Sequence, residues 1–433
     1  MGHDRPPDRA VRAPGAVGWL AGRVHYGWVI ALLGMATVFA CLGIARFSLG
    51  MLLPSMRADL ALSYTVLGWI STANFVGYLV GALGAGQVVA RIGARRTVLA
   101  ALLTVTASLG VVAGAAGVAV ILPAYLITGV GSGVANVAVM GLVPHWFHRR
   151  ARGRASGIMV IGSGFALMGS GLLIPELTAR WGAPGWRLGW AILAAVVFAV
   201  AITVGVFLRN HPRELGLAPH GDDPVAAPAD RGGTSAPKVA NPRSVGAART
   251  MVHLGAIYFL FGFTYVVYVT FIVETLVQRG FSERAAGRFW FVVGALSILS
   301  GPVFGALSDR AGRRIGLAVV FALHGASYLL VGLALAPVAT ILLSVLLFGV
   351  SAWSIPGIMG AAVGDYMGPG QAMTAFGRLT VTFGAGQALG PIVAGAMAEA
   401  SGGFSSAFRL TATLAAGAAL LSLALRPPAA RQP

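Results

Sequence analysis

Apolar runs of about 20 residues, separated by short polar or Gly/Pro-rich breaks, fill most of the chain. A run of this length crosses the hydrocarbon core of a bilayer as an α-helix, so the pattern predicts twelve transmembrane helices. The expected helices are residues 27–53, 64–88, 97–116, 118–143, 155–178, 188–208, 252–277, 285–308, 315–335, 338–361, 375–398 and 405–425. The ten-residue alternating segments of an outer-membrane barrel are absent from the sequence, which favours an all-α membrane fold.

A polar stretch divides the twelve runs into two sets of six. It is rich in Pro, Gly, Asp and Ala and contains the only lysine, Lys238, so we expect a flexible linker without fixed structure. The predicted organisation is an N-tail (1–26), a six-helix bundle (27–208), the linker (209–250), a second six-helix bundle (251–425) and a C-tail (426–433).

Composition and charge agree with a membrane protein. Of the 433 residues, 57% are hydrophobic and only 10% are charged, whereas a soluble domain carries about 25% charged residues. The 31 basic residues lie mainly between the apolar runs. If the N-terminus is cytoplasmic, 23 of them fall on the cytoplasmic side and 7 on the other, which predicts a multi-pass protein of the plasma (inner) membrane with both termini inside.

The same arguments exclude other classes of protein. The basic residues do not form a face interleaved with aromatic residues, so we expect no nucleic-acid partner. Cys41 is the only cysteine, which excludes internal disulfides and cysteine metal clusters. No metal-ligand cluster and no nucleophile with a supporting base is recognisable, so we expect no cofactor and no enzymatic activity.

The two halves resemble each other without gaps, at one constant offset along the chain. Gly43 aligns with Gly262, and at the same offset Ser63 aligns with Ser282. Two parallel six-helix repeats follow from this register, and such architectures bind their substrate near the midplane between the repeats.

Two loops carry the clearest motif. Residues 305–314 read Gly-Ala-Leu-Ser-Asp-Arg-Ala-Gly-Arg-Arg, and residues 86–96 repeat this pattern with Ala90 in place of the aspartate. The motif resembles the loop signature of the major facilitator superfamily of secondary transporters, and the resemblance covers nearly the whole chain outside the tails and linker. It implies the major facilitator fold and a cytoplasmic gate, weaker in the first half, formed by Gly86, Arg91, Gly93, Arg95, Gly305, Asp309, Arg310, Gly312 and Arg313. The alternative is that the arginines of each loop only anchor the membrane topology.

Further segments narrow the resemblance. Trp146-Phe147, the segment Gly185-Trp186-Arg187 and residues 209–219 look like the monocarboxylate and oxalate/formate branch, while residues 43–56 and 74–78 resemble poorly characterised bacterial facilitators. Both groups imply small molecules as substrates, with small organic anions favoured. Tyr125 stands where helix four of many members has an arginine, so the proton-driven exporters that rely on that arginine are a poorer match.

Arg46 is the strongest candidate for a substrate-binding residue, because it lies inside the first apolar run. A charge inside the bilayer costs at least about 2.5 kcal/mol, so it marks a functional site unless a partner neutralises it. Arginine stays charged, and its fork of donors suits a carboxylate. The alternative is that Arg46 extends toward the membrane surface or bonds backbone carbonyls.

No acid is clearly central enough to neutralise Arg46. Ten acids are expected in tails or loops, and three near the outer ends of helices: Asp4, Asp8, Asp59, Glu214, Asp222, Asp223, Asp230, Glu283, Asp309 and Asp365 in the first group, Glu176, Glu274 and Glu399 in the second. An anionic substrate would then be the counterion of Arg46.

Neutral side chains on helices that line the pathway in the superfamily complete the expected site. These are Asn74, Tyr78, Asn136, Tyr265, Tyr268 and Gln387, with helix packing as the alternative role of each. Trp353 could form an aromatic wall, although packing is the better interpretation. Glu274 is the candidate for proton coupling, and His324 is expected to be structural because helix nine is peripheral in this superfamily.

The sequence therefore predicts a monomeric secondary transporter in the lipid bilayer that moves a small organic anion, most simply a monocarboxylate, by alternating access, with proton symport as a further hypothesis. The alternatives are a proton-antiporting exporter of drugs or amphipathic metabolites, and a transport-inactive sensor or assembly factor that has kept the fold.

Overall fold

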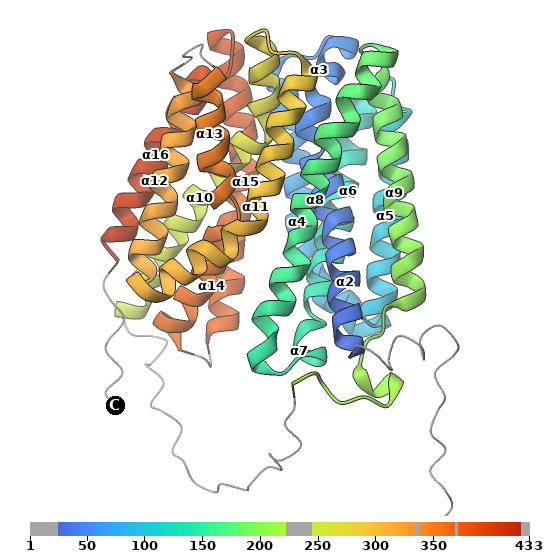
Figure 1. Ribbon diagram of the computed structural model, residues 1–433, viewed down its shortest axis with the longest axis vertical. Helices are drawn as coiled ribbons and strands as arrows, with labels where there is room; N and C mark the ends of the chain where they lie inside the picture. The colour runs from blue at the N-terminus through green and yellow to red at the C-terminus, as the bar shows by residue number, and fades with distance from the viewer. Residues whose placement is uncertain (1–24, 222–244, 334–337, 369–370, 426–433) are drawn as a thin grey trace, which may run out of the picture.

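The computed structural model describes residues 25–221, 245–333, 338–368 and 371–425. The described residues contain twelve helices that are long and apolar enough to span a membrane, and no strand beyond one isolated bridge. Figure 1 shows them as two halves side by side, with the helices up to α9 in one and those from α10 in the other. The predicted all-α fold with twelve spans is confirmed. Most of both predicted tails, and Lys238, lie outside the described residues.

The N-terminal half begins with one long span built from α2, η1 and α3. Its elements are α2 (Tyr26–Val38), η1 (Phe39–Phe47), α3 (Leu49–Leu60), α4 (Tyr64–Ile92), α5 (Ala94–Ala113), α6 (Val118–Met140), α7 (Val143–Trp146), α8 (Arg149–Trp181) and α9 (Gly185–Phe207).

The C-terminal half repeats this arrangement. Its elements are α10 (Val245–Gln278), α11 (Glu283–Ala311), α12 (Arg313–Gly332), α13 (Val338–Ser351), α14 (Ser354–Met367), α15 (Ala372–Ser401) and α16 (Ser405–Leu423). Helices α13 and α14 form a single span with a break at residues 352–353.

The structure reproduces the constant offset between the halves at the level of helix ends. The shift that relates Ser63 to Ser282 also relates both ends of α4 to those of α11, and both ends of α5 to those of α12. Ser63 and Ser282 each accept a hydrogen bond from the third backbone N–H that follows, which caps the helix. Gly93 and Gly312 link the next helices with φ of 80° and 92°, a conformation that side chains disfavour.

Several helices extend past their apolar runs. Four acids that we expected in loops lie instead in the first or last turns of helices: Asp59, Glu283, Asp309 and Asp365. A helix longer than the hydrocarbon core carries its terminal turns into the polar interface, where charged residues are tolerated. Hydropathy alone therefore underestimates helix length in this chain.

The start of the linker is ordered, contrary to our prediction. Residues 209–221 lie against the N-terminal half, with a short 3₁₀ helix η2 (Pro212–Leu215) capped by His211 and Glu214. His220 pairs with the backbone of Trp146 and His148. The proline and the capping side chains fix this segment locally, whereas composition alone indicated disorder. At the other side of the linker, α10 already begins at Val245.

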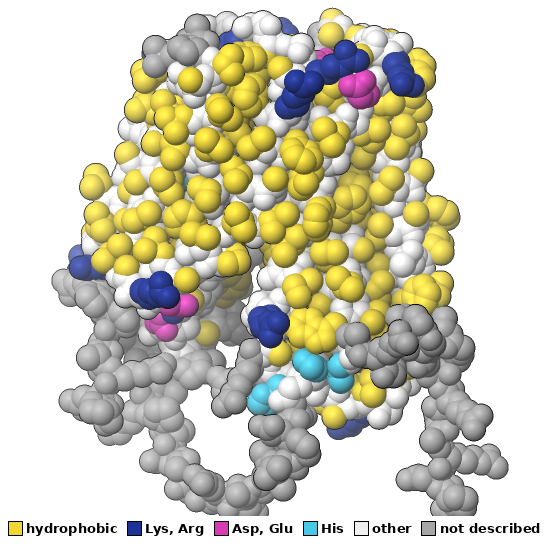
Figure 2. All heavy atoms as spheres, in the orientation of Figure 1, with side chains coloured by type: hydrophobic (Ala, Val, Ile, Leu, Met, Phe, Trp, Pro, Cys, Tyr) yellow, Lys and Arg dark blue, Asp and Glu magenta, His cyan; other side chains and the backbone are white. Residues whose placement is uncertain are grey.

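The halves meet at one end of the bundle. We call the end that carries residues 209–221 the linker end, and the opposite end the distal end. At the distal end, Gly171 of α8 and Gly287 of α11 are so close that a Cβ on either would lie within 2.6 Å of the other's carbonyl oxygen. Between α4 and α15, the Thr72 hydroxyl donates to the carbonyl of Ala388 at 2.7 Å. Figure 2 shows a hollow between the halves at the linker end.

Candidate functional site

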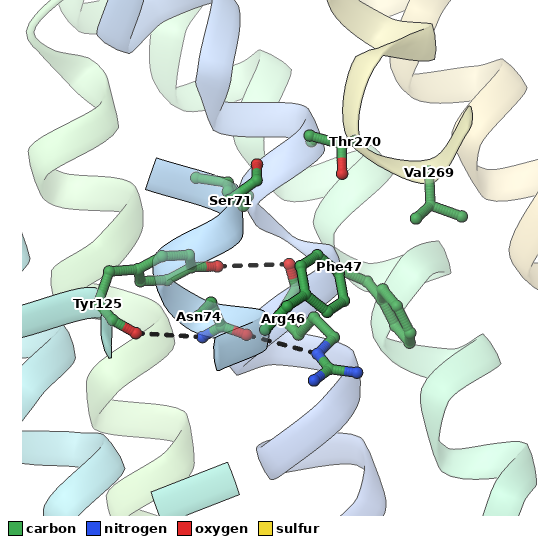
Figure 3. Close-up of a pocket in the computed structure, with 10 residues that line it drawn as sticks. Arg46, Phe47, Ser71, Asn74, Tyr125, Val269 and Thr270 are labelled. Carbon is green, nitrogen blue, oxygen red and sulfur yellow. Dashed lines mark hydrogen bonds between the residues drawn. The ribbon is translucent and has the colours of Figure 1, made fainter. Parts of the chain in front are cut away.

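Arg46 lies in the π-helical segment η1 and is 7% exposed. Its guanidinium carbon is 4.3 Å from the centre of the Phe75 ring and 4.0 Å from that of Tyr78, both on α4. Its Nε donates to Oδ1 of Asn74 at 3.4 Å (Figure 3). Because α4 runs from the distal end to the linker end, this places the charged group level with the middle of α4.

The N-terminal half brings four predicted residues together. Asn74 and Tyr78 lie one turn apart and both contact Arg46. Asn136 of α6 donates from Nδ2 to the Tyr78 hydroxyl at 2.8 Å. Tyr78 and Asn136 are partly exposed, so the solvent-accessible edge of this cluster lies on its linker side.

The C-terminal half faces the cluster with Tyr265 of α10. Its hydroxyl accepts a hydrogen bond from Gln387 of α15 and lies close enough to the Arg46 guanidinium to interact with it. Tyr265 belongs to a stack of four rings with Tyr258, Phe261 and Phe383, whose neighbouring centres are 4.6 to 6.2 Å apart. The site thus has a polar N-terminal wall and an aromatic C-terminal wall.

Trp353 connects the two walls. Its ring stacks on Phe47 of the N-terminal half at 5.0 Å and meets the edge of Tyr265 at 6.1 Å. Its indole Nε1 is buried without a hydrogen-bond partner. Trp353 therefore packs against Phe47 and Tyr265, across the boundary between the halves.

Tyr268 does not join the cluster. Its hydroxyl hydrogen-bonds to Ser344 at 3.2 Å, and its ring stacks on Phe348 at 4.0 Å, inside the C-terminal half. Three positions along a helix leave a rotation of about 60°, which is enough here to turn Tyr265 toward α15 and Tyr268 toward α13. His324 is likewise fully buried within that half, against Phe348.

The charge of Arg46 has no protein counterion among the described residues. The ion pairs there join other residues, and the groups around the guanidinium are amides, a phenol and aromatic rings. Its Nη2 is buried without a hydrogen-bond partner. Burying an unpaired charge is expensive, so the arrangement favours an anion at this position.

Glu274 lies apart from Arg46, at the distal end of α10. It is 1% exposed, and its Oε1 accepts hydrogen bonds from Arg57 of the N-terminal half at 3.4 Å and from Gln278 at 3.0 Å. Its Oε2 is buried without a partner. The candidate proton-coupling carboxylate is thus held between the halves by a single cation.

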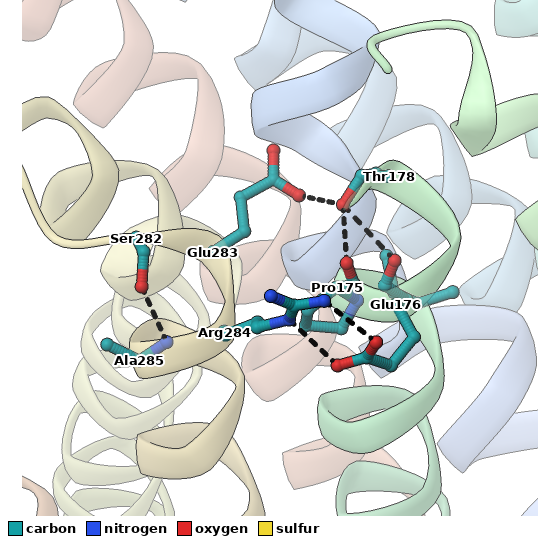
Figure 4. A network of polar contacts seen from close by, with 8 residues as sticks. Pro175, Glu176, Thr178, Ser282, Glu283, Arg284 and Ala285 are labelled. Carbon is teal, nitrogen blue, oxygen red and sulfur yellow. Dashed lines mark hydrogen bonds and ion pairs between the residues drawn. The ribbon is translucent and has the colours of Figure 1, made fainter. Parts of the chain in front are cut away.

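Three further acids join the halves at the distal end. Arg284 forms a two-pronged ion pair with Glu176 at 2.9 and 3.1 Å, and Thr178 donates to Glu283 (Figure 4). Glu399 of α15 accepts from the backbone N–H of Tyr64 at 2.7 Å and so caps α4 across the interface. With Glu274, these contacts form a distal latch, defined here as the pairs Glu274–Arg57, Glu176–Arg284, Glu283–Thr178 and Glu399–Tyr64.

The two loop motifs at the linker end each contact their own half. Arg313 pairs with Asp309 at 2.5 Å and with Asp365 at 2.7 Å. In the first half, Ala94 stands at the position of Arg313 and Ala90 at that of Asp309, so the Arg313–Asp309 ion pair has no counterpart there. Arg95 instead donates from Nε to the carbonyl of Gly205 at 2.8 Å.

The remaining motif residues are positioned as follows. Gly93 and Gly312 form the two turns described above. A Cβ on Gly86 or Gly305 would meet only open space, and Arg91 and Arg310 are exposed.

Sequence reasoning missed the aromatic residues around Arg46. Phe75 lies three positions before Tyr78, so helical spacing could have placed it beside the guanidinium. Tyr125 was noted only as the replacement for a family arginine, although its hydroxyl bonds the backbone carbonyl of Arg46 at 3.3 Å. Nothing in the sequence indicated that Arg57 would reach Glu274, since they lie 217 residues apart.

The chain matches the family described as "Uncharacterised MFS-type transporter YbfB" over residues 38–425. It is 26% identical to the probable sulfoacetate transporter SauU of Cupriavidus necator over 416 residues, which cover 89% of this chain and 90% of the relative. A shorter match of 151 residues, 34% of each chain, is 32% identical to human solute carrier family 67 member A1.

Solved transporter structures resemble the fold at low sequence identity. A bacterial homologue of the human lysosomal transporter Spinster, inward-facing and unoccupied, gives a TM-score of 0.73 at 15% identity over 92% of this chain and 97% of that one. The human organic anion transporter MFSD10 gives 0.59 at 17% identity over 92% and 99% of the respective chains.

Proposed function

The chain belongs to the MFS-type transporter family, which makes it a multi-pass transport protein and not an enzyme, and we propose that it moves a small organic anion by alternating access. Arg46 is the proposed anchor for the anion. The observation that carries this proposal is the buried guanidinium, which has only neutral neighbours and an unpartnered Nη2.

The free-energy cost of burying the Arg46 charge explains why an anion fits this site. A buried cation without a counterion is unfavourable, and the ligand itself would supply the missing charge. A carboxylate or sulfonate can accept two parallel hydrogen bonds from the guanidinium fork. Asn136, Tyr78, Tyr265 and Gln387 would add neutral hydrogen bonds around the ligand.

Two relatives support an anionic substrate. One is named a probable sulfoacetate transporter, and one structural neighbour is an organic anion transporter. Sulfoacetate carries two acidic groups, whereas the described site offers one cationic side chain, Arg46. We therefore propose a ligand with a single full negative charge, most simply a monocarboxylate.

The conformation supports access from the linker end. The distal latch and close-packed glycines hold the halves together at the distal end. At the linker end, the exposed Gly86, Gly157, Gly301 and Gly377 face open space. We propose that the linker end faces the cytoplasm, as the positive-inside count predicts, that the protein is a monomer of the plasma membrane, and that the loop motifs close this end in the opposite state.

Proton coupling is proposed for Glu274. Its Oε1 is held by a single cation, and its buried Oε2 is free to accept a proton. Protonation would release Arg57 and weaken the distal latch, which links the proton to the opening of that end.

Transport of labelled anions by the purified protein in proteoliposomes tests the proposal. Counterflow of acetate, lactate, benzoate and sulfoacetate is measured for the native protein, Arg46→Ala and Arg46→Lys. We expect Arg46→Ala to reduce apparent affinity at least about 30-fold, because removing one member of a buried charge pair costs about 2 to 5 kcal/mol. Arg46→Lys keeps the charge but not the fork and should fall between the two.

The matched control is Arg180→Ala, which removes an exposed arginine at the distal end and should leave counterflow unchanged. Unchanged uptake of all four anions by Arg46→Ala would remove the anchor role. No carboxylate flux, together with drug tolerance in cells that express the protein, would instead favour the exporter.

A further inference from the structure

We propose that Tyr125 is a positioning residue that holds the Arg46 guanidinium in its anion-binding orientation. Tyr125 lies on α6. Its hydroxyl bonds the backbone of Arg46 and its backbone carbonyl accepts a hydrogen bond from Asn74, so it would act through these two residues and not on the substrate. The inference rests on the proposed role of Arg46 as the anion anchor.

The hydroxyl of Tyr125 fixes the backbone that carries Arg46. It donates to the carbonyl oxygens of Ala45 at 2.9 Å and of Arg46 at 3.3 Å. These carbonyls lie where the π-helical segment changes into α3: Ser48 N bonds Gly43 five residues back, whereas Met51 N bonds Ser48 three residues back. Carbonyls at such a change of helix type lack regular partners, so a side-chain donor stabilises the irregular turn.

The backbone of Tyr125 fixes the side chain of Arg46 through Asn74. Nδ2 of Asn74 donates to the Tyr125 carbonyl at 3.3 Å, and Oδ1 of the same amide accepts from Nε of Arg46 at 3.4 Å (Figure 3). A carbonyl can only accept and Nε can only donate, so both partners require the same orientation of the amide. Tyr125 therefore constrains Arg46 at its backbone and at its guanidinium.

Tyr125 itself is held rigidly. It is 1% exposed, and its ring meets that of Trp190 on α9 edge-on at 5.7 Å. The same ring lines a small cavity with Arg46, Ser71 and Thr270. With Nε on Asn74 and the guanidinium carbon over the rings of Phe75 and Tyr78, the buried Nη2 has no hydrogen-bond partner and remains available to a ligand.

The variant Tyr125→Phe tests the inference because it removes only the hydroxyl. The ring, its packing on Trp190 and the carbonyl that orients Asn74 all remain. We expect the KM for counterflow of the best of acetate, lactate, benzoate and sulfoacetate to rise about tenfold, which corresponds to the loss of one good hydrogen bond, while the maximal rate stays within about twofold.

Tyr26→Phe is the matched control. Tyr26 is also buried in the N-terminal half and also donates to a backbone carbonyl, that of Phe207 at 2.7 Å, at the linker end. This variant should leave KM unchanged. A merely structural role of Tyr125 would lower the melting temperature and the maximal rate with KM unchanged, and that result would overturn the inference.

If Tyr125→Phe reconstitutes poorly into proteoliposomes, anion binding is measured in detergent instead, as the rise in melting temperature that the anion produces. The shift produced by a given anion should need about tenfold more anion in Tyr125→Phe than in Tyr26→Phe. If Arg46→Ala abolishes the shift and Tyr125→Phe preserves it, the positioning role is wrong and the anchor stands. If Arg46→Ala preserves the shift, or if none of the four anions produces one in the native protein, the proposed function and the inference fall together.

Discussion

Gly164 of α8 and Gly294 of α11 face each other across the interface between the halves, backbone against backbone. A Cβ on Gly164 would lie 2.9 Å from the carbonyl oxygen of Gly294, and one on Gly294 would lie 2.7 Å from that of Gly164. Gly171 and Gly287 form the same contact one heptad nearer the distal end. Seven residues further toward the linker end, the register brings Gly157 opposite Gly301, yet both are exposed and face open space.

This register predicts a contact that forms when the linker end closes. In a Cys41→Ala background, the pair Gly157→Cys and Gly301→Cys should form a disulfide slowly in the resting protein and faster once a transported anion drives cycling. A disulfide needs Cα atoms within about 7 Å, so it reports closure. Mass spectrometry measures the cross-link, and reductant should restore the counterflow that it blocks. Complete cross-linking at rest, or none during transport, would contradict the register.

A Cβ at Gly294, in the glycine contact between α8 and α11, should favour the state that is open at the distal end. Gly294→Ala pushes a methyl group into the backbone of α8, at a cost of about 1 to 3 kcal/mol for overpacking. We expect a cysteine introduced at the distal end to react faster with a thiol reagent in this variant than in the native protein, and counterflow to be slower. Gly417→Ala is the control, since a Cβ there meets nothing within 4 Å. Equal behaviour of the two variants would show that the halves do not need this close approach.

Glu274→Gln should separate proton coupling from exchange. The amide keeps the size of the side chain but cannot bind or release a proton, so a pH gradient should no longer concentrate the anion while counterflow continues. Two charged neighbours act on Glu274: Arg57, which faces it from α3, and Glu283, which adds a nearby negative charge. The variant keeps both residues, so any change is due to Glu274 alone. Glu176→Gln is the control, because that carboxylate is exposed. Gradient-driven accumulation by Glu274→Gln would exclude this residue as the proton site.

The ordered start of the linker should loosen on acidification. His25 accepts from Gly27 N at 3.1 Å through Nδ1 and bonds the Ala218 carbonyl at 3.0 Å through Nε2. Burial and the neighbouring His220 lower the pKa of His25 below its ordinary 6.5. Because the released ring binds a proton more readily than the docked one, docking is fully stable above about pH 6.5 and weakens as the pH falls below it.

Hydrogen exchange of residues 209–221 measures this effect. Protection, corrected for the intrinsic rate, should fall between about pH 7.5 and about pH 5.5. His25→Asn keeps an N-cap acceptor but does not titrate, so its protection should depend less on pH than that of the native protein. A native protein whose protection is flat over this range would contradict the assignment.

The fold could be predicted because its determinants are local. Run length gives the spans, and the constant offset between the halves recurs in the structure as matching helix ends and matching capping serines. The family resemblance, carried by two loops, agrees with the match over residues 38–425. Helix ends were less predictable, because Asp59 and its neighbours continue α3 beyond the apolar run.

The site was only partly predictable, because it depends on how helices face one another. Spacing placed Asn74 and Tyr78 on one face of α4, and the structure sets both against Arg46. The same reasoning failed for Tyr268, since helical spacing does not say which face meets the other half. The distal latch joins residues more than 100 positions apart, and no local pattern encodes such pairs.

The π-helical stretch of residues 39–47 makes the direction of the proposed anion anchor, Arg46, depend on the number of residues in that stretch. A π turn accommodates one residue more than an α turn. Deleting a single apolar residue there would leave composition and hydropathy almost untouched and let the stretch relax into an ordinary helix. Side chains on one side of the deletion would then rotate by about 100° about the helix axis relative to those on the other side. Arg46 would no longer point toward α4 and Tyr265.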